Sequence, residues 1–160
     1  MKHLKSGLML LLIVSSLLYG GSRVSNIILS GNLIEASSQH LSVDELTHGL
    51  KYVSERVYNP YEKRTDIYGG VLIDEFVQKY ANENTQSIEL IAIDDYSITI
   101  TKDEWKSMRI ILSTEINNKK ISIKNKGPLR IVFPDYDPQE TQYQTNIASW
   151  IWMIKKIKFK

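Results

Sequence analysis

The apolar residues of this chain repeat with two different spacings, and the switch between them constrains the fold more than any other feature. Between residues 71 and 81 they recur at the spacing of an amphipathic helix, with charged and amide side chains between them: Leu72, Phe76, Val77 and Tyr80. From Ser87 onward apolar and polar residues alternate, which is the pattern of strands with one buried face. The sequence therefore predicts one clear helix followed by a half of the chain built mainly of strands.

Shorter signals predict further elements. Residues 26–29 form an apolar run typical of an opening strand. Ser42, with Glu45 three residues later, has the form of a capping box and predicts a short helix. The pair Asn117-Asn118 predicts a tight hairpin turn between two strands, because asparagine tolerates positive φ.

The predicted breaks and the remaining predicted strands indicate the fold class. Gly69-Gly70 is expected to break the chain before the helix, and residues 135–145 to form a polar loop. Residues 129–133 and 149–160 are each expected to form a strand. Because strands outnumber helices, we expect a single α+β domain with a mixed, mainly antiparallel sheet and a few short helices.

The tripeptide Asp94-Asp95-Tyr96 is a predicted irregularity. The apolar residues before and after it fall on opposite faces of a continuous strand. A strand changes face only at a bulge or a turn. We therefore expect a polar turn here.

The first 21 residues have the composition of an export signal. Lys2 and Lys5 precede an apolar run from Leu8 to Leu18, and small residues occupy positions 20–22. A spanning helix needs roughly 20 apolar residues, so residues 1–21 are predicted to be a secretory signal peptide and residues 22–160 the mature domain. An uncleaved N-terminal anchor is the alternative.

The balance of charge argues against a nucleic-acid partner. Without Lys2 and Lys5, 18 basic side chains balance 18 acidic ones. A neutral domain lacks the long-range attraction to phosphate on which nucleic-acid binding depends. No such partner is expected.

Common catalytic and metal-binding patterns are missing. The chain contains no cysteine and no Gly-x-Ser-x-Gly motif. His40 and His48 lie eight residues apart with no third nitrogen ligand, which argues against a zinc site. Acidic residues in predicted turns more often bond nearby backbone amides than bind a cation. We therefore predict no catalytic residue and no metal.

Two features suggest a ligand site instead. Trp150 and Trp152 lie two residues apart, so in a strand they share a face, either as sheet packing or as the floor beneath a flat heterocycle. Arg130 interrupts an apolar strand and requires an acid, an anion or water. An ion pair with Asp94 or Asp95 is the structural interpretation, and a role in lining a pocket is the functional one.

The ordered set of segments resembles the sulfite-oxidase-type (oxidoreductase molybdopterin-binding) domain family. The resemblance rests on residues 41–46, Asn59-Pro-Tyr61, residues 68–73, the Asp-Asp-Tyr turn, residues 126–129 and the tryptophan-bearing end of the chain. In the enzymes of the family a cysteine thiolate holds molybdenum, so this cysteine-free chain is expected to carry no molybdenum. The resemblance is to small, exported, cysteine-free members that look like pterin-binding sensors.

The resemblance implies a function. It implies a non-catalytic periplasmic protein that senses a reduced pterin, without a covalent cofactor, and signals to the periplasmic domain of a membrane cyclic di-GMP synthase or phosphodiesterase. The predicted pterin-binding residues are Asp95, Tyr96, Arg130 and Trp152. Two alternatives remain: a degenerate scaffold that acts as an interaction subunit without a small-molecule ligand, and an oxidoreductase that holds molybdenum without cysteine.

Overall fold

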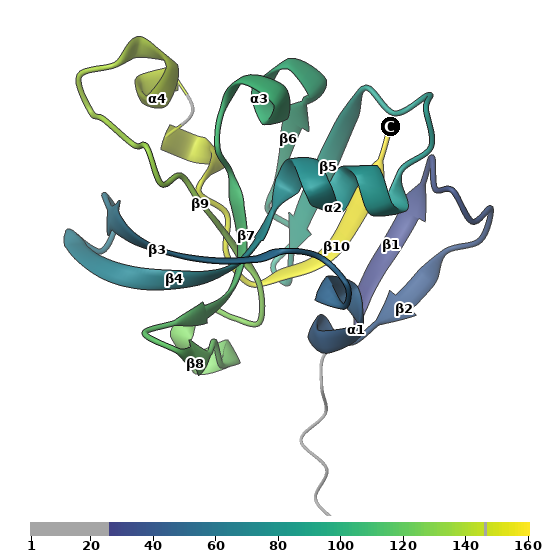
Figure 1. Ribbon diagram of the computed structural model, residues 1–160, viewed down its shortest axis with the longest axis horizontal. Coiled ribbons are helices and arrows are strands. Elements are labelled where there is room, and N and C mark those ends of the chain that lie inside the picture. Colours follow the sequence, from purple (N-terminus) through teal and green to yellow (C-terminus); the bar gives the residue numbers. More distant parts are fainter. Residues whose placement is uncertain (1–25, 146) are drawn as a thin grey trace, which may run out of the picture.

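The computed structural model describes residues 26–145 and 147–160, which form two five-stranded sheets with short helices beside them (Figure 1). The strands are β1 (Ile27–Gly31), β2 (Gln39–Leu41), β3 (Tyr52–Asn59), β4 (Arg64–Leu72), β5 (Ser87–Ala92), β6 (Ser97–Thr101), β7 (Ile111–Ile116), β8 (Lys119–Lys120), β9 (Arg130–Val132) and β10 (Ile154–Phe159). The helices are α1 (Val43–Thr47), α2 (Ile73–Tyr80), α3 (Lys102–Ser107) and α4 (Thr141–Thr145), with 3₁₀ turns η1 (Ile123–Asn125) and η2 (Ile147–Ser149). The predicted signal peptide, residues 1–21, lies outside the described residues. Within the part of the chain described here, no helix is long and apolar enough to cross a membrane.

The sheets confirm the predicted α+β class. The first sheet has the order β2-β1-β10-β5-β6, and the second has the order β3-β4-β7-β8, with β9 also paired to β7. The β1–β10 pair is parallel, and the other strand pairs of the described residues are antiparallel. Because the closing strand β10 lies between β1 and β5, both ends of the described chain are fixed in one sheet.

The predicted amphipathic helix is α2, which lies across one face of the first sheet (Figure 1). Its apolar stripe is buried, and Phe76 stacks on Phe159 of β10 with ring centroids 5.9 Å apart. Both rings belong to one continuous core between the sheets. The helix therefore contributes to the fold through packing rather than through helix propensity alone.

Local signals in the sequence are confirmed at three places. Ser42 and Glu45 form the predicted capping box at the start of α1. Asn117 and Asn118 have φ values of 51° and 61° in the turn between β7 and β8. The tripeptide that begins at Asp94 lies in the turn between β5 and β6. Each of these features is decided by neighbours in sequence.

The expected break at Gly69-Gly70 is wrong, because both glycines lie inside β4. The register of β4 against β7 shifts between them, which is a β-bulge. A Cβ atom on Gly70 would lie 2.2 Å from the carbonyl oxygen of Leu112. The absence of a side chain therefore permits close approach of two strands here.

Two expectations near the end of the chain need correction. The polar loop over 135–145 contains α4. The closing strand begins at Ile154 instead of residue 149, because Met153 has a positive φ of 56°. The segment before Ile154 contacts β9 through an isolated bridge between Arg130 and Trp152. Residues 150 and 152 are therefore not part of a regular strand.

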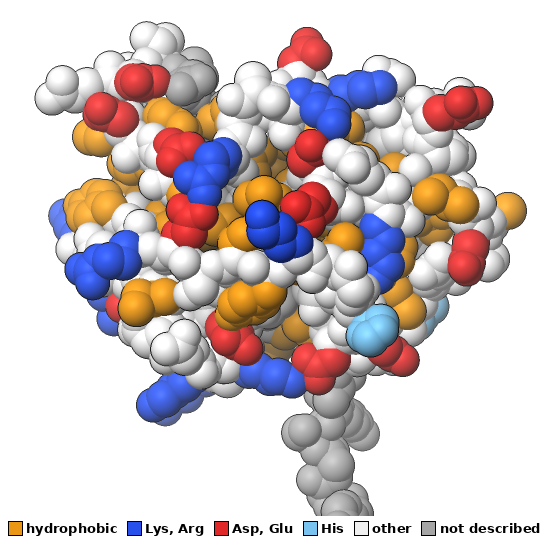
Figure 2. Space-filling view, viewed as in Figure 1, with side chains coloured by type: hydrophobic (Ala, Val, Ile, Leu, Met, Phe, Trp, Pro, Cys, Tyr) orange, Lys and Arg blue, Asp and Glu red, His pale blue; other side chains and the backbone are white. Residues whose placement is uncertain are grey.

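The face shown in Figure 2 carries mixed charges, with acidic and basic side chains interspersed over its whole extent. Several surface pairs are in ion-pair contact, among them Lys106 with Asp74 and Arg109 with both Glu55 and Asp135. Exposed pairs of this kind contribute little each. This face agrees with the near-neutral composition of the domain.

Gly69→Ala is expected to lower the pKa of Tyr52. The Tyr52 hydroxyl donates a 2.7 Å hydrogen bond to Glu115 across β4, and partial burial together with this bond raises its pKa to about 12. A Cβ on Gly69 would lie 1.8 Å from that hydroxyl oxygen, so the ring must move away. In an ultraviolet pH titration of the variant, the phenolate should form nearer the ordinary pKa of 10.

The sign of the associated pH effect follows from the raised pKa. Tyr52 binds its proton more tightly in the folded state, so its contribution to stability is complete below pH 10 and is lost between pH 10 and about 12. Tyr52→Phe identifies the titration, because it should remove the step near pH 12. An unchanged step in Gly69→Ala would contradict the expected displacement.

Candidate functional site

An aromatic pocket of about 280 Å³ lies beside the first sheet. We use this name for the cavity lined mainly by Tyr61, Asp94, Tyr96, Trp150, Trp152 and Met153. The residues come from the turn after β3, the β5–β6 turn and the segment before β10. The topology thus collects aromatic rings from three distant parts of the chain.

Two tyrosines at the rim hold the same short segment. The Tyr61 hydroxyl donates to the carbonyl oxygen of Ile147 at 2.8 Å, and the Tyr96 hydroxyl donates to that of Ala148 at 2.9 Å. Both rings remain about half exposed. Partial burial is the main cause that raises the pKa of Tyr61. The rim therefore consists of two phenol groups that are hydrogen-bonded to η2.

The two neighbouring tryptophans have different surroundings. Trp150 is buried against Phe133 and Tyr136, with ring centroids 5.5 Å and 5.7 Å away. Trp152 is only partly buried, and its ring meets Tyr61 edge to face at 5.6 Å. Both line the aromatic pocket, although they do not share a strand face as predicted. Trp152 is the ring with free surface.

The structure does not bring Asp95 to the pocket. Asp95 lies in the left-handed region with φ 67°, and its exposed carboxylate pairs with Lys155 at 2.8 Å. The hydrogen bond from Lys155 and its charge hold the pKa of Asp95 below the usual value. Asp94 lines the pocket instead, and its carboxylate accepts from the backbone N–H of Tyr96 at 3.2 Å.

Arg130 is fully buried and pairs with Glu62, so of the two interpretations the ion pair with Asp94 or Asp95 is wrong. Its Nη1 lies 3.0 Å from a carboxylate oxygen of Glu62, which belongs to the turn after β3. The guanidinium carbon also lies 5.4 Å from the ring centre of Tyr68. β9 pairs with β7 in the second sheet, whereas the β5–β6 turn belongs to the first sheet.

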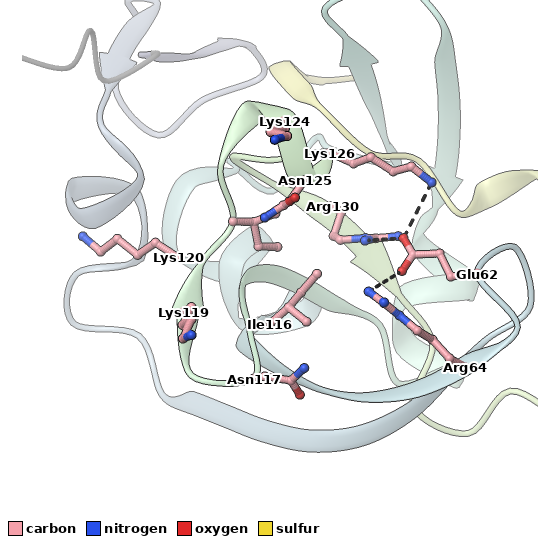
Figure 3. Close-up of a pocket in the computed structure, with 11 residues that line it drawn as sticks. Glu62, Arg64, Ile116, Asn117, Lys119, Lys120, Lys124, Asn125, Lys126 and Arg130 are labelled. Carbon is pink, nitrogen blue, oxygen red and sulfur yellow. Dashed lines mark hydrogen bonds and ion pairs between the residues drawn. The ribbon is translucent and has the colours of Figure 1, made fainter.

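Arg130 lines a second cavity of about 680 Å³, which we call the basic cavity (Figure 3). Its charged lining residues are Glu62, Arg64, Lys119, Lys120, Lys124, Lys126 and Arg130. Lys126 connects the two cavities, because its Nζ lies 4.6 Å from the ring centre of Trp152 and 3.6 Å from Glu62. The predicted residues Tyr96 and Trp152 therefore lie at one cavity and Arg130 at the other.

The donor groups at these cavities do not fit a thiolate-bound molybdenum. The chain contains no cysteine. Within the described residues, no group of three or more His, Cys, Asp or Glu side chains is placed to hold a metal ion. The aromatic pocket offers ring faces, phenol groups and one carboxylate, which suit a flat organic ring better than a metal.

Three residues that line the cavities were not predicted from the sequence: Tyr61, Glu62 and Lys126. Tyr61 ends the short Asn59-Pro-Tyr61 segment, and Lys126 precedes a Gly-Pro pair. Glu62 accepts a hydrogen bond from Arg130, which lies 68 positions later in the sequence. The Asn59-Pro-Tyr61 segment of the resemblance was the one signal that pointed to this turn.

Comparison with known proteins supports the fold. No protein-family model matches the chain, and no curated protein matches it. Among solved structures, the sulfane dehydrogenase SoxCD from Paracoccus pantotrophus is similar, with a TM-score of 0.57 and 9% sequence identity over 84% of this chain. The match covers 37% of the SoxCD chain, so this protein spans well under half of that neighbour. At this identity the likeness concerns the fold alone, and it is that of a single sulfite-oxidase-type domain.

Proposed function

We propose that the protein is a non-catalytic periplasmic binding protein for a reduced pterin, which reports ligand occupancy to a membrane enzyme that makes or degrades cyclic di-GMP. The observation that carries the proposal is the aromatic pocket between Tyr61 and Trp152 in a sulfite-oxidase-type fold whose chain contains no thiol. The membrane partner and the exported location rest on the family resemblance and on the composition of residues 1–21.

The shape and chemistry of the aromatic pocket support a ring-sized ligand. Its volume of about 280 Å³ lies near the lower end of small-molecule sites. The partly exposed ring of Trp152 offers a stacking surface. Asp94 accepts hydrogen bonds when ionised, which suits the amino and ring N–H groups of a pterin. A pterin is therefore matched both by the rings and by the acceptor at the rim.

The rim offers a way to transmit occupancy. Tyr61 and Tyr96 hold η2 through two hydroxyl bonds, and both are exposed enough to be touched by another protein. A ligand that displaces either ring would favour one arrangement of η2 over another. A partner that contacts this rim would then bind the occupied and the unoccupied arrangement with different affinity.

The direct test is to purify the exported protein and record its absorption and fluorescence spectra, followed by titration with tetrahydrobiopterin as the probe. We expect one bound pterin per chain and no stoichiometric molybdenum by elemental analysis. Stoichiometric molybdenum with turnover of a substrate would overturn the non-catalytic proposal. Absence of pterin after reconstitution would favour the scaffold.

Trp152→Ala is expected to weaken pterin binding at least about tenfold while lowering the free energy of unfolding by about 1 kcal/mol. The reason is that this ring is only partly buried and lines the pocket. Calorimetric titration and urea unfolding measure the two effects. Tyr58→Ala is the matched control, because it removes an exposed aromatic ring that does not line the pocket. Equal losses in folding and binding would assign Trp152 to the core.

One observation favours the scaffold as the second candidate. β3 forms an edge of the second sheet and carries the exposed rings of Tyr52 and Tyr58. Edge strands offer unpaired backbone groups to a partner strand. A protein that binds no pterin but loses its partner on substitution in β3 would fit this candidate.

A further inference from the structure

The basic cavity concentrates positive charge that the rest of the domain balances. Figure 3 shows lysines of β8 and η1 on one side of the cavity and Glu62 with Arg64 on the other. Of the described residues, six with cationic side chains line it, against one carboxylate, that of Glu62. A concave surface of one charge attracts small ions of the opposite sign. The near-neutral composition of the chain therefore conceals a local site of strong positive potential.

One carboxylate serves several of these cations. Glu62 lies 3.1 Å from Arg64, 3.0 Å from Arg130 and 3.6 Å from Lys126. Arg64 has a further acid, Asp66, at 2.6 Å. Glu62 thus lies at the centre of a cluster in which the positive charges outnumber its one negative charge.

The lysines on the opposite side are less compensated. Lys120 pairs with Asp44 at 2.7 Å, on the open surface. Lys119 and Lys124 are exposed, and within the described part of the chain neither has an acid at ion-pair distance. Their ammonium groups are available to an anion that enters the cavity.

The buried arginine provides an independent indication of a ligand. Only 2% of the Arg130 side chain is exposed, and its Nε is a buried donor that has no hydrogen-bond partner among the residues the structure describes. A buried N–H without an acceptor is costly, and a charged one more so. Arg130 has kept a donor that Glu62 does not use.

We propose that the basic cavity binds a small anion of the diphosphate class and that Glu62 occupies the position of this anion when none is bound. Arginine presents planar, paired donors that match phosphate oxygens, and lysines add point charges. Arg130 and Lys126 form the inner side of the site, and Lys119 and Lys124 the outer side. Binding exchanges one carboxylate for a more highly charged group, and Glu62 is displaced from Arg130.

The first test is calorimetric titration with inorganic pyrophosphate at constant ionic strength, with sodium chloride as the reference salt. We expect a Kd of about 1 mM or tighter. The double variant Lys119→Ala/Lys124→Ala should bind at least about tenfold more weakly, because two charge-assisted contacts are lost. Lys158→Ala, an exposed lysine of β10 outside the cavity, is the matched control and should bind as the wild type does. No binding to the wild type, or equal binding by the double variant, would overturn the proposal.

The second test concerns Glu62. If Glu62 competes with the anion, Glu62→Gln should bind pyrophosphate about fivefold more tightly, because glutamine keeps the shape and removes the charge. Both proteins are compared at a temperature at which circular dichroism shows them folded. Unchanged or weaker binding by Glu62→Gln would overturn the competition.

The anion site is tested separately from the proposed pterin site. Tyr96→Ala should keep its affinity for pyrophosphate within about twofold, since Tyr96 lines the aromatic pocket and does not line the basic cavity. Failure of pyrophosphate to bind leaves the pterin titration to decide the proposed function on its own. Because Lys126 contacts the Trp152 ring, pyrophosphate should also change the tryptophan fluorescence of the wild type, and this change should disappear in Trp152→Phe.

Discussion

Glu62→Ala is expected to lower the free energy of unfolding by about 3 kcal/mol, because it leaves the charge of Arg130 buried without its partner. Among the described residues, Glu62 is the one acid within ion-pair distance of Arg130, whose side chain is 2% exposed. Removing one member of a buried ion pair costs far more than the pair itself contributes. Urea unfolding followed by circular dichroism measures the loss.

Two further variants test this explanation. Replacing both members, in Arg130→Met/Glu62→Leu, should recover most of the stability, because no charge then remains stranded in the interior. Glu89→Ala breaks a surface pair with Lys160 and should cost less than about 1 kcal/mol. A double variant as unstable as Glu62→Ala would show that the stranded charge is not the cause of the loss.

Phe76→Ala is expected to lower the free energy of unfolding by about 4 kcal/mol, which is a larger loss than that expected for Glu62→Ala. The ring is fully buried and packs between Tyr80 and Phe159, at centroid distances of 5.1 Å and 5.9 Å. Its removal leaves a cavity between α2 and the first sheet that rigid strands cannot close. The free energy of unfolding in urea is again the measurement.

The exposed residue Gln78 of the same helix supplies the control for Phe76. Gln78→Ala removes a side chain of α2 without opening the core and should change stability by less than about 0.5 kcal/mol. If Phe76→Ala lowered the free energy of unfolding by less than about 2 kcal/mol, the packing of α2 on the core would contribute less to stability than the buried ring indicates.

Part of the candidate site was predictable because single residues violate the local pattern. Arg130 is out of place in an apolar strand, and Trp152 lies two residues from a second large aromatic residue, Trp150. The structure places both at cavities, although at different ones. Asp95 was expected beside Tyr96 in the pocket, but its positive φ turns it toward Lys155 and leaves Asp94 at the pocket. A change of one residue within a turn reverses the direction of a side chain, which residue types alone do not predict.

The elements that the amino-acid pattern predicted correctly depend on neighbours a few positions away. The capping box at Ser42, the positive φ of Asn117 and the stripe of α2 are examples, since each satisfies hydrogen bonds or burial within one segment. The pairing of Glu62 with Arg130 joins residues 68 positions apart. This pairing depends on which strands are adjacent. The position of several lysines around one cavity, in a chain of balanced charge, depends on the same adjacency. Strand order is a property of the whole packed core, so only the tertiary structure could decide where the charges and the aromatic rings meet.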